Sequence, residues 1–221
     1  MNTFFLDRLN GEPHALAFAG QSTPWPVALA DQSDNPMLSE ALHAHVDAAQ
    51  ALLYPVAADL LATTGRPVDL FGFEPNPARL GAAAAASASV PGIALAQLGA
   101  LLDATSLGYN PAVAKPVAVL GHSQGVLAVH MVQAIVEAGS VEAASAQIDE
   151  ILAIATLIGV AGTRQARQLG LAARHGEATP MLSVKDITRA QVDALIERVS
   201  GARGPIAVAV TNSATHYVLS G

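Results

Sequence analysis

The segment "PVAVLGHSQGVLAVHMV", residues 116–132, constrains the fold of this chain more than any other stretch. A short apolar run leads into Gly-His-Ser-Gln-Gly, and a second apolar run with helical spacing follows it. A sharp turn from a strand into a helix needs small residues beside the exposed side chain, and Gly121 and Gly125 flank Ser123. The pattern predicts a nucleophile elbow that exposes the Ser123 hydroxyl at the carboxyl edge of a sheet.

The position of Ser123 at the start of a helix adds a chemical argument to this geometric one. The motif Gly-x-Ser-x-Gly is by itself weak evidence for a nucleophile, because a chain with 18 glycines and many serines can contain it by chance. Free backbone N–H groups at a helix N-terminus, however, favour the negative charge that develops when a serine attacks a carbonyl carbon. We therefore interpret Ser123 as a nucleophile and not as a small residue of an ordinary turn.

The order of the remaining elements predicts an α/β fold of two parts. Short apolar strands alternate with longer helices up to about residue 177, which is typical of a mainly parallel sheet with helices on both faces. After that the order becomes strand, amphipathic helix and two strands, as in a ferredoxin-like lobe without its last helix. We expect a core over residues 1–177 and an incomplete small lobe over residues 178–221, as in a fragment truncated at its C-terminus.

Composition excludes several classes of function. The chain has no cysteine, which rules out disulfides, a catalytic thiol and thiolate metal sites and fits a cytoplasmic protein. Its net charge of −7 gives no general attraction to nucleic acid or to an anionic membrane. No apolar run reaches the roughly 18 to 20 residues of a membrane span, and the N-terminus has no signal-peptide pattern.

Several segments resemble, in the same order, those of acyl-carrier-protein transacylases. The Gln after the Ser has the form seen in type I fatty acid synthases, and nearly the whole chain is similar to the N-terminal acetyltransferase domain of the bacterial, actinobacterial synthases. The resemblance implies an α/β-hydrolase-like core. The segments that carry it are "AFAGQSTPW" (17–25), "SVPGIALAQLGAL" (89–101), "GHSQGVLAVH" (121–130), "LIGVAGTRQARQ" (157–168) and "NSATHYVLSG" (212–221).

The resemblance implies a ping-pong acyl transfer. Ser123 attacks an acyl-CoA thioester and then passes the acyl group to the phosphopantetheine thiol of an acyl carrier protein. The backbone N–H groups of Gln21 and Gln124 match the oxyanion hole, in which one donor is worth on the order of 3 kcal/mol. Ser22 replaces the glycine that relatives have after that first glutamine. No tightly bound cofactor and no metal are expected, because coenzyme A and phosphopantetheine enter as substrates.

The general base is missing from the residues that match the family. Relatives use a histidine that follows the small lobe, and this sequence ends inside that lobe. None of the seven histidines matches that position. His122 is an elbow residue with a structural role, and His216 is interpreted as lying at the edge of the small lobe's core. His43 and His45 are two residues apart on a helix and face different ways, so no metal site is predicted there.

Substrate choice is argued from Ile158. Malonyl-loading relatives carry an arginine before the matching glycine, where it binds the free carboxylate; this chain has Ile158-Gly159. A malonyl carboxylate buried there would lose water without gaining a partner, at a cost of several kcal/mol. The sequence therefore predicts an acetyl or other short unsubstituted acyl group. The expected partners are acetyl-CoA, a carrier-protein domain and the other domains of a large, homo-oligomeric synthase.

Three other readings stay open at this point. A serine thioesterase or esterase would share the elbow, although the Gln21 loop and the small lobe favour transfer over hydrolysis. A malonyl/palmitoyl transferase of the same synthases would share all of these segments. The chain could also be a non-catalytic structural part of a synthase.

Overall fold

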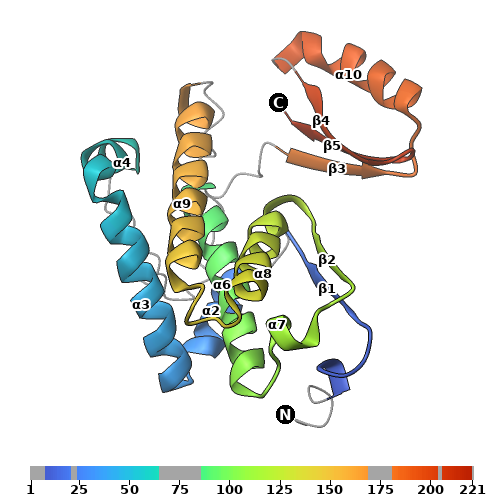
Figure 1. Cartoon of the computed structure of the whole chain (residues 1–221). Helices are drawn as coiled ribbons and strands as arrows, with labels where there is room; N and C mark the ends of the chain where they lie inside the picture. The colour runs from blue at the N-terminus through green and yellow to red at the C-terminus, as the bar shows by residue number, and fades with distance from the viewer. Residues whose placement is uncertain (1–7, 21–23, 65–85, 169–180, 204–205, 221) are drawn as a thin grey trace. The chain divides into compact units, whose positions relative to one another are not determined.

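The computed structural model describes residues 8–20, 24–64, 86–168, 181–203 and 206–220. The chain divides into two compact units, Met1–Gln165 and Ala166–Gly221. The division falls twelve residues before the boundary expected after residue 177, which itself lies outside the described residues. Figure 1 labels the elements, and each unit is described by itself.

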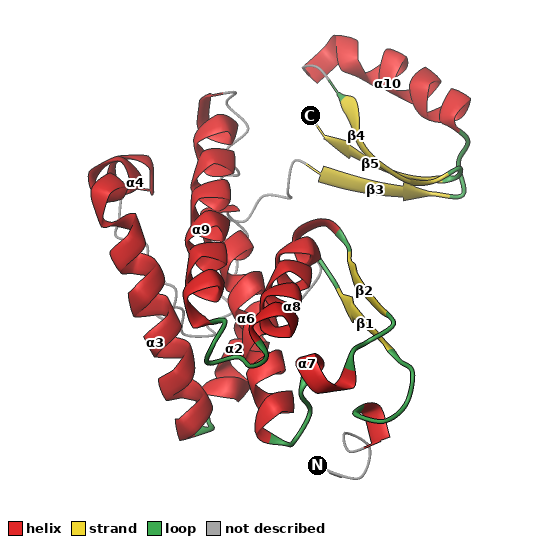
Figure 2. Cartoon of the chain, viewed as in Figure 1, coloured by secondary structure: helices red, strands yellow, loops and turns green. Residues whose placement is uncertain are grey.

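Helices dominate the first unit, as Figure 2 shows. Its elements, in chain order, are β1 (Ala15–Phe18), α2 (Trp25–Ser33), α3 (Pro36–Leu53), the 3-10 turn η1 (Tyr54–Val56), α4 (Ala57–Thr64), α6 (Ala86–Ser106), α7 (Pro111–Ala114), β2 (Ala118–Gly121), the 3-10 turn η3 (Ser123–Gly125), α8 (Val126–Ala138) and α9 (Ser145–Gln168).

Local sequence explains where several of these helices begin and end. The Asn35 side chain accepts a hydrogen bond from the Leu38 N–H, and Pro36 takes the first helical position of α3. Asn110 caps the short α7 in the same way, through the Ala112 N–H. Gly139 ends α8 with φ +91°, a left-handed backbone that glycine adopts without strain. α3 is followed directly by η1, which contains Pro55.

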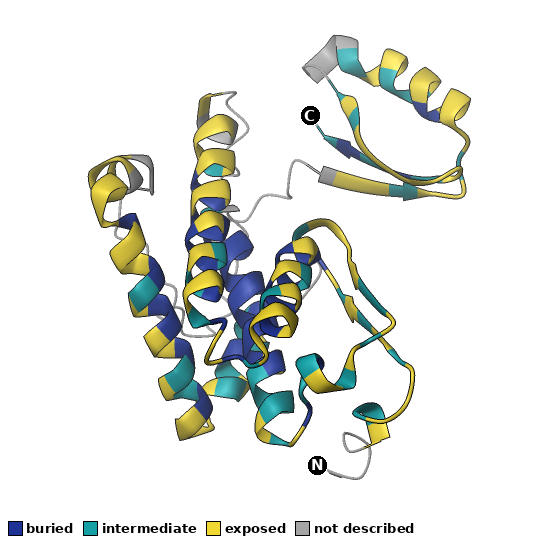
Figure 3. Cartoon of the chain, viewed as in Figure 1, coloured by how far each residue is buried: buried dark blue, intermediate teal, exposed yellow. Residues whose placement is uncertain are grey.

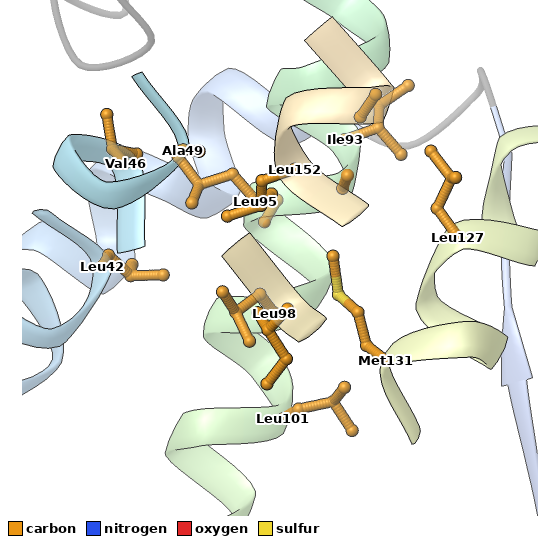
Figure 4. Close-up of a cluster of buried hydrophobic side chains, with 14 of the residues drawn as sticks. Leu42, Val46, Ala49, Ile93, Leu95, Leu98, Leu101, Leu127, Met131 and Leu152 are labelled. Carbon is orange, nitrogen blue, oxygen red and sulfur yellow. The ribbon is translucent and has the colours of Figure 1, made fainter. Parts of the chain in front are cut away.

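The core of the first unit is built around α6. Ile93, Leu95 and Leu98 on this helix are fully buried, and α3, α8 and α9 contribute further apolar side chains to the same cluster (Figures 3 and 4). Burial of this kind stabilises a fold by about 25 cal/mol per Å² of apolar surface. The most buried helix thus lies beside the turn that carries Ser123, because α6 packs against both η3 and α8.

One buried polar pair joins two of the helices around α6. The Nδ1 atom of His45 on α3 lies 2.6 Å from Oδ1 of Asp149 on α9. Both side chains are almost covered, so the pair satisfies groups that would be costly to bury alone. His43 is instead exposed and contacts the Ser39 carbonyl. The two histidines face different ways, as the sequence predicts, and no cluster of metal-ligating side chains occurs among the described residues.

The described part of the first unit contains one parallel pair of strands. β1 and β2 run side by side with Ala15 opposite Ala118 and Phe18 opposite Gly121. The two strands and the helix after the elbow are confirmed, whereas the larger parallel sheet expected from the alternation is not seen in the described residues. The α/β-hydrolase-like core stays a proposal.

The second unit has the predicted order of strand, helix and two strands. β3 (Met181–Lys185), α10 (Arg189–Arg203), β4 (Ala207–Ser213) and β5 (His216–Ser220) form an antiparallel sheet in the order β3-β5-β4, packed against α10. Val192 of α10 and Tyr217 and Leu219 of β5 make its small core. The strand that is last in sequence lies in the middle, which ties the C-terminal segment into the unit.

Two described helices have the length and hydropathy of a membrane span. They cover Ser87–Ser106 in α6 and Ser145–Gln165 in α9, and the core helices of soluble proteins pass the same test. In α6, 72% of the apolar window is buried inside the structure, as expected for a core helix. The window in α9 is only 44% buried, so this helix keeps an apolar face outside the core.

Candidate functional site

The turn after β2 holds Ser123 in an unusual backbone conformation. Its φ angle is +54°, in the left-handed region that residues other than glycine rarely adopt. β2 ends two residues earlier, and α8 begins three residues later. The predicted strand, tight turn and helix are therefore all present, and the Ser123 side chain is exposed. This is the geometry that presents a hydroxyl to a substrate.

The end of β1 holds the turn in place. The N–H of His122 donates to the Phe18 carbonyl at 3.0 Å, and the Gly125 N–H donates to the His122 carbonyl at 2.9 Å. The first bond continues the pairing of β1 with β2 beyond Gly121. Ser123 thus sits between two backbone hydrogen bonds, one to the neighbouring strand and one across the turn itself.

Glycines allow the backbone segments of the turn to approach this closely. A Cβ on Gly125 would overlap the Phe18 carbonyl oxygen, and a Cβ on Gly121 would lie 2.6 Å from the Gly125 carbonyl carbon. Neither distance is possible in an unshifted structure. Both flanking glycines, which the sequence assigns to the elbow, are required for steric reasons.

A loop that follows β1 contacts the serine directly. Gly20 is buried, and a Cβ on it would lie 2.9 Å from the Ser123 Cβ and 2.6 Å from the His122 carbonyl oxygen. The position of such a Cβ is also 3.5 Å from the Gln124 backbone nitrogen. The next residue, Gln21, lies outside the described residues, as does Ser22. The structure therefore places the start of the predicted oxyanion loop beside Ser123, and Gln21 as a donor stays a prediction.

Gln97 is a polar contact of this loop that the sequence patterns do not single out. Its Nε2 donates to the Ala19 carbonyl oxygen at 2.5 Å. Ala19 immediately precedes Gly20 in the chain. One signal was available, because Gln97 is the polar residue in the middle of the apolar run "VPGIALAQLGALL" (90–102).

The histidines are not joined to Ser123 in the described part of the chain. His122 is exposed at the start of η3, and no described histidine is hydrogen-bonded to Ser123 Oγ. His216 belongs to the second unit, where its Nε2 lies 2.9 Å from Ser183 Oγ and 3.4 Å from Asn212 Nδ2. The base assigned by resemblance to a segment after the small lobe stays a prediction.

Ile158 lies on the apolar outer face of α9. It is 51% exposed, and Ile154 and Leu157 beside it are 50% and 42% exposed. An open groove of about 490 Å³ separates α9 from α8, with Val126, Leu127 and Ile154 among its apolar lining residues. Val126 is the first residue of α8, directly after the turn with Ser123. One lining residue of the groove is thus three positions after Ser123 in the chain, whereas Ile158 is not among the residues that line it.

The groove has no lysine or arginine among the side chains that line it. Its charged lining residues are Glu137 and Glu150, both exposed. A free carboxylate in this groove would meet like charge and apolar side chains instead of a guanidinium group. The rest of the lining consists of five apolar side chains and the polar side chains of His130, Gln133 and Gln147, so the groove suits a group without negative charge.

Comparison with known proteins decides the family. The sequence model described as "SAT: Starter unit:ACP transacylase in aflatoxin biosynthesis" matches residues 27–221. The match leaves out only the first 26 residues. The chain belongs to the starter-unit transacylase family. A search of curated proteins gave no match.

Membership in the starter-unit transacylase family shows an acyltransferase domain that acts with an acyl carrier protein. The matched range includes Ser123, Gln124 and Ile158, and it begins after Gln21. The family description names aflatoxin biosynthesis, so the match supports the transacylase part of the resemblance and not fatty acid synthesis in particular.

The steric account of the elbow predicts a difference between two glycines of the first unit. Gly125→Ala should lower the free energy of unfolding by about 1–3 kcal/mol, because the new methyl group overlaps the Phe18 carbonyl. Gly11→Ala is the control, since its Cβ would meet only the Arg8 carbonyl at 3.9 Å. Urea unfolding of both variants measures the difference. Equal stabilities would contradict the close approach of β1 and the turn.

Proposed function

We propose that the chain is a serine-dependent acyltransferase that loads an unsubstituted short acyl group onto an acyl carrier protein. The observation that carries the proposal is the left-handed backbone of Ser123 in a strand–turn–helix, with Gly20 packed against it. A turn of this kind gives the hydroxyl free access to a thioester. The backbone N–H group of Gln21, which follows Gly20, is the oxyanion donor that the resemblance implies.

The reaction proceeds in two balanced steps. Ser123 Oγ attacks the thioester carbonyl while a base takes the hydroxyl proton. The C–S bond of the tetrahedral intermediate then breaks, the base returns the proton to the sulfur of coenzyme A, and a serine ester remains. The phosphopantetheine thiol of the carrier protein next gives its proton to the base and attacks this ester, the C–O bond to Ser123 breaks, and the serine oxygen regains the proton. The oxyanion of each intermediate is stabilised by the backbone N–H groups of Gln124 and Gln21. For the base we propose a histidine after the small lobe, as in the transacylases that the sequence resembles.

Apolar lining supports an unsubstituted acyl group. Ile158 occupies the position at which malonyl-loading relatives have an arginine, and it lies among the exposed apolar side chains of α9. The groove between α8 and α9 has Glu137 and Glu150 in its lining and no lysine or arginine. Acetyl-CoA is the donor that we propose, in the cytoplasm and within a homo-oligomeric type I synthase of fatty acids, as the resemblance implies. The family description equally allows a synthase of the aflatoxin kind.

Incubation with radioactive acetyl-CoA tests the proposed function. A protein extended beyond residue 221 to include the proposed base should acquire about one acetyl group on Ser123, because the elbow presents that hydroxyl, and Ser123→Ala should lose the label. Peptide mapping by mass spectrometry locates the ester. Pantetheine should discharge the label much faster than water does.

Two outcomes of this experiment would contradict the proposal. Steady hydrolysis of the acyl group would indicate a thioesterase. Absence of any Ser123-dependent label, even in the protein extended beyond residue 221 to include the proposed base, would indicate a non-catalytic part of a synthase.

Selection against malonyl groups is tested at Ile158. Ile158→Arg should raise the ratio of malonyl to acetyl labelling by roughly tenfold or more, since a charge-assisted hydrogen bond to the malonyl carboxylate is worth about 1.5–3 kcal/mol. Leu157→Arg is the matched control, because it adds the same charge at an adjacent, similarly exposed position. Competition between the two labelled thioesters measures the ratio. Equal changes in both variants would show a general charge effect and no specificity at Ile158.

A further inference from the structure

Gln97 is a buried polar side chain among buried apolar residues of α6. It is 7% exposed, and its neighbours Leu95, Ala96 and Leu98 on α6 are 0–4% exposed. An amide group in such a place is costly to bury unless its atoms are hydrogen-bonded. A methionine or leucine would fill the same space without that cost. The presence of an amide therefore calls for a contact that only a hydrogen-bond donor can make.

The contact is made with the backbone that leads to Ser123. Gln97 Nε2 donates to the Ala19 carbonyl at 2.5 Å, across 78 positions of sequence. Ala19 is followed by Gly20, whose Cα is so near Ser123 that an added Cβ would lie 2.9 Å from the serine Cβ. α6 is the central helix of the core, so its side chains provide a rigid support. The core is thus connected to the candidate nucleophile in two steps. Gln97 binds the Ala19 carbonyl, and Gly20, the next residue in the chain, packs against Ser123.

The amide oxygen of Gln97 makes no corresponding contact. Gln97 Oε1 is buried and has no hydrogen-bond partner in the described part of the chain. The side-chain amide is oriented with its NH2 group toward the Ala19 carbonyl, because a carbonyl oxygen can only accept a hydrogen bond. In this orientation the amide oxygen stays buried without a partner, at a cost in free energy. The bond to the loop is the polar interaction that the described structure gives this side chain.

Gln32 supplies an internal comparison. Its Nε2 donates to the Ala96 carbonyl at 2.9 Å, and its Oε1 is also buried without a partner in the described residues. In both glutamines the amide nitrogen donates one hydrogen bond to a backbone carbonyl and the amide oxygen has no described partner. They differ in what they hold: Gln32 joins α2 to α6, whereas Gln97 joins α6 to the loop beside Ser123.

We infer that Gln97 is a positioning residue for the candidate active site. Its side-chain amide fixes the Ala19 carbonyl, and through it the Gly20 backbone, against the turn that carries Ser123. The contact between Gln97 and the Ala19 carbonyl follows from geometry alone. The effect of this contact on the rate of Ser123 acylation rests on the proposed function. Gln97 touches no reacting atom in this account. It acts by keeping the loop that begins at Gly20 in register with the serine.

The paired variants Gln97→Met and Gln32→Met test this inference. Methionine keeps the length and volume of glutamine but lacks the donor. Hydrogen exchange, followed by mass spectrometry of the peptide over residues 18–25, reports directly on the loop. Gln97→Met should speed exchange there by about tenfold or more, because the loop loses its attachment to the core, and Gln32→Met should leave that peptide nearly unchanged.

Acylation kinetics provide the second readout. Gln97→Met should slow single-turnover labelling of Ser123 by roughly tenfold to a hundredfold, the loss expected from a small misplacement of catalytic groups. The affinity for the thioester should change little, and Gln32→Met should leave both quantities near those of the wild type. A general loss of packing would slow acylation in both variants alike. A positioning role of Gln97 would slow it only in Gln97→Met.

The outcomes distinguish the inference from the proposed function. Equal loop exchange in the two variants would overturn the role of Gln97, whatever the labelling shows. Absence of Ser123 labelling in every protein, each extended beyond residue 221 to include the proposed base, would overturn the proposed function, while hydrogen exchange would still decide the role of Gln97. If Gln97→Met fails to fold, Gln97→Leu with its control Gln32→Leu replaces the pair, and the same criteria apply.

Discussion

The contact between the end of β1 and the turn after β2 is the constraint on which the rest of the candidate site depends. The His122 N–H bonds to the Phe18 carbonyl, and three glycines let the two backbones meet without side chains between them. With its neighbours held in this way, Ser123 takes a left-handed backbone conformation. Strain of this kind, of order 1–3 kcal/mol for a residue other than glycine, persists only where the surrounding structure enforces it.

The helical core of the first unit holds the backbone around Ser123 in this conformation. α6 is buried along most of its length and contacts both the 3-10 turn and α8, so it supports the elbow from within. Gln97 extends the same support to the loop beside the serine. α9 differs, since its outer face with Ile154 and Ile158 is left exposed next to an apolar groove. The unit thus combines a rigid support under Ser123 with an apolar surface near it, a combination that suits transfer of an acyl group.

Local patterns predicted those parts of the structure that depend on local interactions. The strand and helix around Ser123, the flanking glycines and the strand-helix-strand-strand order of the second unit all follow from short-range spacing. The extent of the sheet did not follow, because strand pairing is a long-range property and the described residues of the first unit contain one parallel pair. The role of Gln97 was equally hidden, since its partner is 78 positions away. Family membership rests on the match over residues 27–221, and Gln21 and the base remain predictions.

The central claim is that the elbow forces Ser123 into a left-handed backbone, and the stability of two variants at that position tests it most directly. A left-handed conformation costs residues with a Cβ roughly 1–2 kcal/mol, a cost that glycine does not bear. Urea unfolding should therefore show Ser123→Gly to be more stable than Ser123→Ala by about 1 kcal/mol. The opposite order, with alanine the more stable, is the one expected for an ordinary helical residue and would contradict the account.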